Sequence, residues 1–187
     1  METYISLLRG VNVGGQRKIR MKDLADAYES LGFKNVRTYL QSGNAIFGFA
    51  LNDAGKLSSI IEAGIRQKFG FPVKVLIRNV NELQLMIKSN PFLKRKGIDA
   101  EKLHVTFLSA DPGKEPALKL DAGASGTDEF RLSGKEIYLF CPNGYGRTKL
   151  SNNFFEKRLG VTATTRNWNT VQTLLEIACH PSLDHQD

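Results

Sequence analysis

The feature that most constrains the fold of this chain is an order of secondary-structure elements that occurs twice. Short runs rich in aliphatic, β-branched and aromatic residues predict strands, and apolar residues spaced by three and four predict helices. The first half has the expected order strand, helix, strand, strand, helix, strand, at residues 4–8, 21–31, 36–41, 44–49, 56–69 and 73–78. The second half has the same order at residues 103–109, 115–120, 128–132, 136–141, 151–159 and 161–165, followed by a helix at 170–178. The order βαββαβ is that of a ferredoxin-like unit, so the sequence predicts an α+β protein of two such units in tandem.

A connecting helix is expected between the two predicted units. Asn79 is its predicted N-cap, and Glu82 stands three residues later in capping-box position. Pro91 ends this helix, and the basic turn Lys94–Gly97 is the expected linker. The predicted division is a first unit at 1–79, a connecting helix and basic linker at 80–101, a second unit with the C-terminal helix at 102–179, and a tail at 180–187.

The positive charge of the chain is concentrated in two segments. The 187 residues have a formal net charge of +7, of which residues 9–22 carry +5 and residues 144–170 carry +4, so the remainder is slightly acidic. Both segments are rich in glycine or asparagine. Clustered cations on loops favour an anionic partner such as phosphate, a nucleotide or nucleic acid. A basic surface that only aids solubility is the alternative interpretation.

Composition also limits the compartment and the chemistry. No apolar run approaches the roughly 20 residues of a membrane span, and residues 1–4 lack the pattern of a signal peptide. Two cysteines, Cys141 and Cys179, are too few for a disulfide framework and lack metal spacing. We therefore expect a cytoplasmic protein with no membrane partner. The three histidines are scattered, which predicts no metal site, and no motif specifies a cofactor.

The segment between the first strand and the first helix has the chemistry of an anion-binding loop. Its glycines permit turns in which backbone N–H groups face an anion, a helix N-terminus follows, and its cations can clamp phosphate or carboxylate. The spacing matches neither GxGxxG nor a Walker loop. A long, mobile basic loop is the alternative. The candidate ligand-binding residues here are Arg9, Asn12, Gly14, Gly15, Arg17 and Lys18.

Three further segments resemble the first loop in composition or place. The predicted hairpin at 41–44 offers amide and hydroxyl groups, the strand-to-helix segment 142–151 again joins glycines to cations, and 164–170 holds the single tryptophan. For each, an ordinary turn, cap or core residue is the alternative, and Ser42 lacks the surroundings of a nucleophile. The candidate ligand-binding residues in these segments are Gln41, Ser42, Asn44, Arg147, Lys149, Arg166, Asn167 and Trp168.

The predicted topology groups these segments in pairs. In a βαββαβ unit the first loop and the middle hairpin lie at one end of the sheet, which joins residues 9–20 to 41–44. The loop after the third strand and the end of the fourth strand share the opposite end, which joins residues 142–150 to 164–169. If the two ends meet, they form one basic cleft between the units, and the sequence leads us to expect such a cleft.

The chain resembles a known bacterial family, the domain-of-unknown-function 1697 proteins, over nearly its whole length. The residues that carry the resemblance are Leu7–Gly15, Met21, Leu24, Thr38–Asn44 and Thr165–Thr170. The family usually has Ser-Lys-Leu before the late helix, where this chain has Thr148-Lys149-Leu150. The resemblance implies a similar α+β fold and no particular activity.

Three classes of function compete at this point. The favoured hypothesis is a binding protein for an anionic small molecule, a nucleotide or phosphorylated metabolite, with single-stranded nucleic acid as a further alternative. The second is an enzyme that acts on a phosphorylated or carboxylated metabolite, with cations that stabilise charge but with no evident nucleophile or base. The third is a scaffold whose loops are structural. The ferredoxin-like order also occurs in RNA-binding domains, but the aromatic pattern of those domains is missing from residues 44–49.

Overall fold

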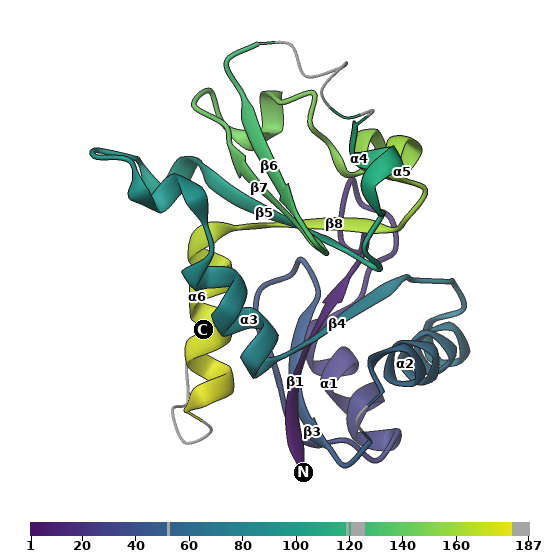
Figure 1. Cartoon of the computed structure of the whole chain (residues 1–187). Helices are drawn as coiled ribbons and strands as arrows, with labels where there is room; N and C mark the ends of the chain where they lie inside the picture. Colours follow the sequence, from purple (N-terminus) through teal and green to yellow (C-terminus); the bar gives the residue numbers. More distant parts are fainter. Residues whose placement is uncertain (52, 119, 121–125, 181–187) are drawn as a thin grey trace. The chain divides into compact units, whose positions relative to one another are not determined.

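The structure is a computed structural model that describes all residues except 52, 119, 121–125 and 181–187. It divides into two compact units, shown in Figure 1. The first unit comprises Met1–Leu85 together with the chain from Thr173 onward, and the second comprises Met86–Gln172. The boundaries therefore fall inside two helices, α3 (Val80–Lys88) and α6 (Trp168–Cys179).

The first unit is built on a four-stranded antiparallel sheet with the strand order β2-β3-β1-β4. Its elements before α3 are β1 (Glu2–Leu8), α1 (Met21–Ser30), β2 (Lys34–Thr38), β3 (Asn44–Phe49), α2 (Ala54–Phe69) and β4 (Val75–Asn79). The two central strands, β3 and β1, are buried along most of their lengths.

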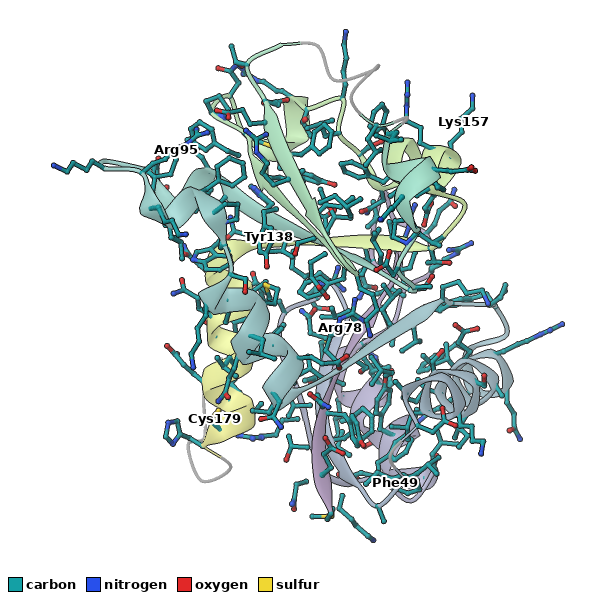
Figure 2. The ribbon with its side chains drawn as sticks, viewed as in Figure 1. Phe49, Arg78, Arg95, Tyr138, Lys157 and Cys179 are labelled. Carbon is teal, nitrogen blue, oxygen red and sulfur yellow. The ribbon has the colours of Figure 1, made fainter. Side chains whose placement is uncertain are left out.

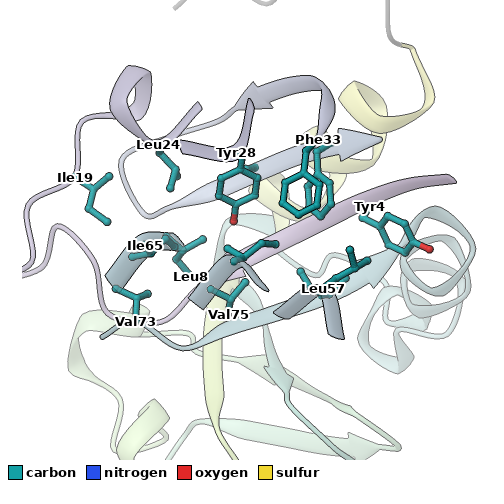
Figure 3. Close-up of a cluster of buried hydrophobic side chains, with 14 of the residues drawn as sticks. Tyr4, Leu8, Ile19, Leu24, Tyr28, Phe33, Leu57, Ile65, Val73 and Val75 are labelled. Carbon is teal, nitrogen blue, oxygen red and sulfur yellow. The ribbon is translucent and has the colours of Figure 1, made fainter. Parts of the chain in front are cut away.

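The core of this unit lies between one face of the sheet and the helices α1 and α2 (Figure 3). Alternate residues of a strand point to the same face, and here Tyr4 and Leu8 of β1 pack with Leu24, Tyr28 and other apolar residues. Ser6 makes polar contacts inside this core: its hydroxyl oxygen lies 2.8 Å from that of Tyr28, and its hydroxyl also donates to the carbonyl of Ala45 at 3.2 Å. Burial raises the pKa of Tyr28, so its hydroxyl is neutral and can share this hydrogen bond.

The second unit repeats the same sheet with the order β6-β7-β5-β8, also antiparallel. Before α6 it contains 3-10 turns at Pro91–Lys94, Ala100–Lys102 and Tyr145–Arg147, and β5 (Leu103–Leu108), α4 (Lys114–Leu118), β6 (Glu129–Ser133), β7 (Glu136–Phe140), α5 (Asn152–Leu159) and β8 (Ala163–Asn167). The chain is thus a mixed α+β protein with two four-stranded antiparallel sheets, as the element order predicts. Among the described residues, no helix combines the length and apolar character needed to cross a membrane.

The basic turn predicted as a linker is attached to the second unit. The guanidinium of Arg95 donates two hydrogen bonds to Glu129, at 2.7 and 2.6 Å, and lies 4.9 Å from the ring centre of Phe92. Nearby, the hydroxyl of Tyr138 donates to the carbonyl of Met86 at 2.9 Å; Arg95 and Tyr138 are labelled in Figure 2.

Most predicted element boundaries agree with the structure within two residues, and the differences have local causes. The strand predicted at 36–41 is found as β2, which ends at Thr38, because Leu40 adopts a left-handed backbone conformation with φ 59°. The last helix starts two residues before the predicted position. The side chain of Asn167, at the end of β8, accepts a hydrogen bond from the N–H of Asn169 at 2.9 Å, so the helix starts directly after that strand.

The end of α6 is fixed to β2 by an arginine. The guanidinium of Arg37 donates hydrogen bonds to the backbone carbonyls of Ile177 and His180, the second at 3.2 Å. A cation at the C-terminus of a helix satisfies carbonyls that have no partner inside the helix and complements the helix dipole. The last turns of the C-terminal helix therefore belong with the first unit, although the sequence groups the whole helix with the second.

Candidate functional site

The loop between β1 and α1 is anchored to the first unit on both sides of an exposed tip. Val11 and Ile19 are buried in the core described above. Between them, the side-chain amide of Asn12 donates to the carbonyls of Ile19 at 2.9 Å and Gln41 at 2.8 Å. Its oxygen accepts from the N–H of Ile19 at 2.8 Å. These contacts fix where the tip, residues 13–18, leaves the body of the unit.

The tip itself is a small hairpin. Val13 and Gln16 form an isolated antiparallel bridge, and Gly14 and Gly15 make the turn with φ of 60° and 76°. Two successive positive φ angles are typical of a type I′ turn, which side chains with a Cβ adopt poorly. The glycines that the sequence marks as candidates thus shape the turn of the tip.

The β2–β3 connection lies against this loop, as the topology predicts. The N–H of Leu8 donates to the carbonyl of Gly43 at 2.8 Å. Gly43 has φ 78°, and a Cβ there would lie 2.5 Å from Cγ2 of Val11. The fully buried Asn44 donates from its amide to the carbonyl of Tyr39 at 2.7 Å. Loop 9–20 and the β2–β3 connection, residues 39–44, therefore form one surface of the first unit, which we call the loop end.

Backbone strain is concentrated at the loop end. Among the described residues, four that are not glycine have positive φ, and three of them, Asn12, Arg17 and Leu40, lie here. The left-handed region is unfavourable for residues with a Cβ, and such outliers gather at functional sites because the surrounding structure must hold them.

The loop end carries cations without matching acids. Residues 9–22 contain no acidic residue, and the exposed side chains of Arg17 and Lys18 form no hydrogen bond or ion pair with the described part of the chain. Arg20, also exposed, pairs with Asp23 at 2.9 Å, which at a surface contributes little stability. Arg17 Nη1 would lie 3.7 Å from a Cβ at Gly10, so its guanidinium is near the base of the loop.

Helix α1 begins beside these cations without a side-chain cap. Its N-cap residue is Arg20, whose side chain accepts no hydrogen bond from the first turn. In contrast, Asp53, Asn79 and Ser151 cap α2, α3 and α5 through side-chain oxygens. A cation at a helix N-terminus opposes the helix dipole, so the start of α1 has neither a side-chain cap nor a favourable charge from its N-cap residue.

The second unit gathers its candidate residues at the opposite end of its sheet, also as predicted. The register pairs Leu103 with Phe140, and His104 with Asn167, which brings the segment 142–151 next to the end of β8. Arg147 and Lys149 are exposed, with no ion pair to the described residues. This end also holds acidic residues, including Glu129, so it is less uniformly basic than the loop end.

Three candidate residues of β8 and α6 are engaged or buried. Arg166 is 6% exposed and donates to the hydroxyl of Thr164 at 2.8 Å and to the carbonyl of Thr165 at 2.9 Å. Burial lowers its pKa to about 10, which leaves the guanidinium charged at neutral pH. Asn167 donates to the carbonyl of Glu101 at 3.2 Å, and Trp168 is 1% exposed. These positions support the fold of the second unit directly.

A polar cluster on the sheet of the second unit was not expected from the sequence. The ring of His104 stacks on Tyr145 with centres 4.9 Å apart, and burial lowers the pKa of His104. Next to it, the hydroxyls of Thr106 and Thr165 lie 2.7 Å apart, and Thr165 donates to Asn152 at 2.7 Å. The sequence signal for this cluster was the alternation of polar residues in the two predicted strands. Only the pairing of those strands shows that these polar residues lie side by side.

One of the two cysteines, Cys141, is buried in the second unit. Burial raises the pKa of Cys141 to about 11, so its thiol is protonated at neutral pH and a poor nucleophile. Within the same described part of the chain, no group of three or more His, Cys, Asp or Glu side chains gathers as metal ligands do.

The fold and the loop end thus define an α+β protein with two antiparallel sheets and a basic, pre-formed loop surface. The model of the family described as a protein of unknown function (DUF1697) matches residues 1–138, so the chain belongs to this family. The resemblance seen in the sequence is thereby confirmed.

Comparison with solved structures supports the same architecture. The chain is similar to the conserved bacterial protein SP0830 from Streptococcus pneumoniae, with a TM-score of 0.73 and 20% sequence identity. The similarity covers 96% of this chain and 99% of that one. At this identity the likeness concerns the fold alone. A search of the curated proteins finds no match.

Proposed function

We propose that the protein binds an anionic small molecule, a nucleotide or phosphorylated metabolite, at the loop end of its first unit. The observation that carries this proposal is an acid-free loop tip, held in place by Asn12, that presents Arg17 and Lys18 beside the uncapped start of α1. Backbone N–H groups at a helix start and flexible cations are the two groups that most often hold phosphate in proteins.

We also propose that both units are ferredoxin-like. The support is that each follows the element order βαββαβ and that the strand order of both sheets places the first strand of the unit next to the third and fourth. In such a unit the loop end lies at the end of the sheet where β1 finishes and β3 begins. Ligand contacts made from that edge leave the packed core undisturbed.

The test is a calorimetric and thermal-shift measurement with AMP, pyrophosphate and ribose 5-phosphate at low salt. A ligand at 100 times its Kd stabilises the native state by about 2.7 kcal/mol, a shift that is easily measured. We expect the double variant Arg17→Gln/Lys18→Gln to lower the affinity at least about tenfold, because it removes two charge-assisted contacts.

The matched control is Lys34→Gln/Lys88→Gln, which removes the same net charge from exposed residues that are not part of the loop end. It should retain the affinity of the unaltered protein. Equal losses of affinity in both variants would mean that only overall charge matters. If none of the three anions binds, the proposal is refuted.

Single-stranded nucleic acid is distinguished by salt. Each phosphate neutralised on a single strand contributes about −0.7 to the slope of log K against log salt concentration. The affinity for an oligonucleotide should therefore fall steeply as salt is added, whereas the affinity for a small anion held by two cations should fall only slightly. A steep slope with oligonucleotides and no binding of AMP would assign the loop end to nucleic acid.

A further inference from the structure

Two exposed aliphatic side chains belong to the loop end. Val13 is 67% exposed on the tip, and Leu40 is 41% exposed at the start of the β2–β3 connection. Their neighbours in the chain are joined directly, because the Asn12 amide donates to the carbonyl of Gln41. Single exposed aliphatic residues are common on protein surfaces, so their position alone implies nothing.

Leu40 differs from an ordinary exposed leucine because its backbone is strained. It has φ 59°, and its carbonyl accepts from the N–H of Gly43 at 3.3 Å, which closes the turn. Glycine or asparagine would take this conformation at lower cost. The strain is not offset by full burial of the side chain. A leucine here therefore weakens the fold slightly and presents apolar surface at the same time.

We propose that the ligand of the loop end is an organic phosphate whose apolar portion lies against Leu40 and Val13 while its phosphate is held by Arg17 and Lys18. This inference rests on the proposed function and narrows it from anions in general to anions that carry an apolar group. Inorganic phosphate would satisfy the cations but leave the two aliphatic side chains in water.

The predicted consequence is a preference that depends on the apolar group. Contact with one leucine side chain is worth about a tenfold change in affinity, from the transfer free energy of its buried surface. AMP and hexyl phosphate should thus bind the protein several-fold to tenfold more tightly than ribose 5-phosphate, and inorganic phosphate should bind most weakly.

The experiment compares these four probes by calorimetry on the unaltered full-length protein and on Leu40→Asn. Asparagine tolerates the left-handed conformation, so the turn is kept while the apolar side chain is removed. We expect Leu40→Asn to lower the affinity for AMP and hexyl phosphate about tenfold and to leave that for ribose 5-phosphate within twofold. The control Leu85→Gln alters a leucine that is 65% exposed on α3 and should change no affinity.

The outcomes separate this inference from the proposed function. If all four phosphates bind equally and Leu40→Asn changes nothing, the apolar contact is refuted while anion binding stands. If only AMP binds more tightly than ribose 5-phosphate, the apolar portion of the ligand is a base. If only hexyl phosphate does so, the apolar portion is an aliphatic chain. Either result supports the inference. If no phosphate binds but the protein sediments with phosphatidylserine vesicles and Leu40→Asn abolishes this, the small-molecule assignment is overturned.

Discussion

The asparagines of the loop end illustrate how a residue can serve a site without facing a ligand. Asn12 and Asn44 direct their amides to backbone carbonyls of the loop and the β2–β3 connection. The sequence marks both as candidate ligand contacts because amides are common in binding loops. In the structure their side-chain groups hold the shape of the loop end. The exposed candidate side chains include those of Arg17, Lys18 and Gln41, and that of Ser42, whose hydroxyl accepts from the amide of Asn44 at 3.1 Å.

Gly43 is the residue on which the joining of loop and connection depends most directly. We predict that Gly43→Ala lowers the free energy of unfolding by about 2–4 kcal/mol, because its Cβ would collide with Val11 and Leu8 at a positive φ. Gly70→Ala is the matched control, since Gly70 has φ 80° and open space around it; it should cost only about 1 kcal/mol. Urea unfolding measures both, and equal losses would contradict the steric argument.

His104 makes the stability of the protein depend on pH. Burial lowers its pKa in the folded state, so the unfolded chain takes up a proton first as the pH falls. The free energy of unfolding should therefore be highest above the pKa of His104 in the unfolded chain, about 6.5, and should decrease as the pH falls below that value. His104→Phe keeps a ring against Tyr145 and removes the titration. Urea unfolding from pH 7.5 to 5.5 should give a flatter profile for this variant than for the unaltered protein.

At the scale of elements, helix caps show which local signals the sequence carries. Asn79 and Glu82 form the predicted capping box, with reciprocal hydrogen bonds of 2.8 and 2.9 Å. Ser151 caps α5 by accepting a hydrogen bond from the N–H of Phe154 at 3.2 Å. Such contacts join residues three positions apart, so a pattern reveals them. The start of α6 lies two residues before the predicted position, because the side chain that accepts from its first turn is that of Asn167, the last residue of β8.

The missing cap of α1 leads to a prediction with opposite effects on stability and binding. Arg20→Ser supplies a side-chain oxygen for the first turn and should raise the free energy of unfolding by about 0.5–1 kcal/mol. The same change should weaken phosphate binding, because the hydroxyl then occupies the N–H groups and one cation is lost. Thermal unfolding and calorimetry with AMP test the two effects. A variant that is both less stable and unchanged in binding would contradict the role given to α1.

At the scale of the whole molecule, the contact that sequence reasoning could not find joins the beginning of the chain to its end. Arg37 and Ile177 are 140 positions apart, and no local pattern connects them. The two repeated sheets were predictable because strands and helices have their own periodicities. The distribution of the last helix between the units, and the strain at Leu40, depend on packing that only the folded chain creates.

The Arg37 contact predicts how the end of the chain contributes to stability. Arg37→Ala should lower the free energy of unfolding by about 1–3 kcal/mol, because the carbonyls of Ile177 and His180 lose a charged donor. Arg131→Ala changes an arginine on β6, the corresponding edge strand of the second sheet, and should cost no more than about 0.5 kcal/mol. Chemical denaturation of both variants provides the comparison, and similar losses would refute the special role of Arg37.

The division of α6 has a consequence for synthesis on the ribosome. Domains are generally completed in the order in which they emerge, with the N-terminal one first. Here the unit that contains the first residue also needs the residues after Thr173 for its final contacts. Its own sheet can form early, but the edge strand β2 receives its last partner only after the second unit has been translated. The first unit therefore begins to fold before the second unit and is finished after it.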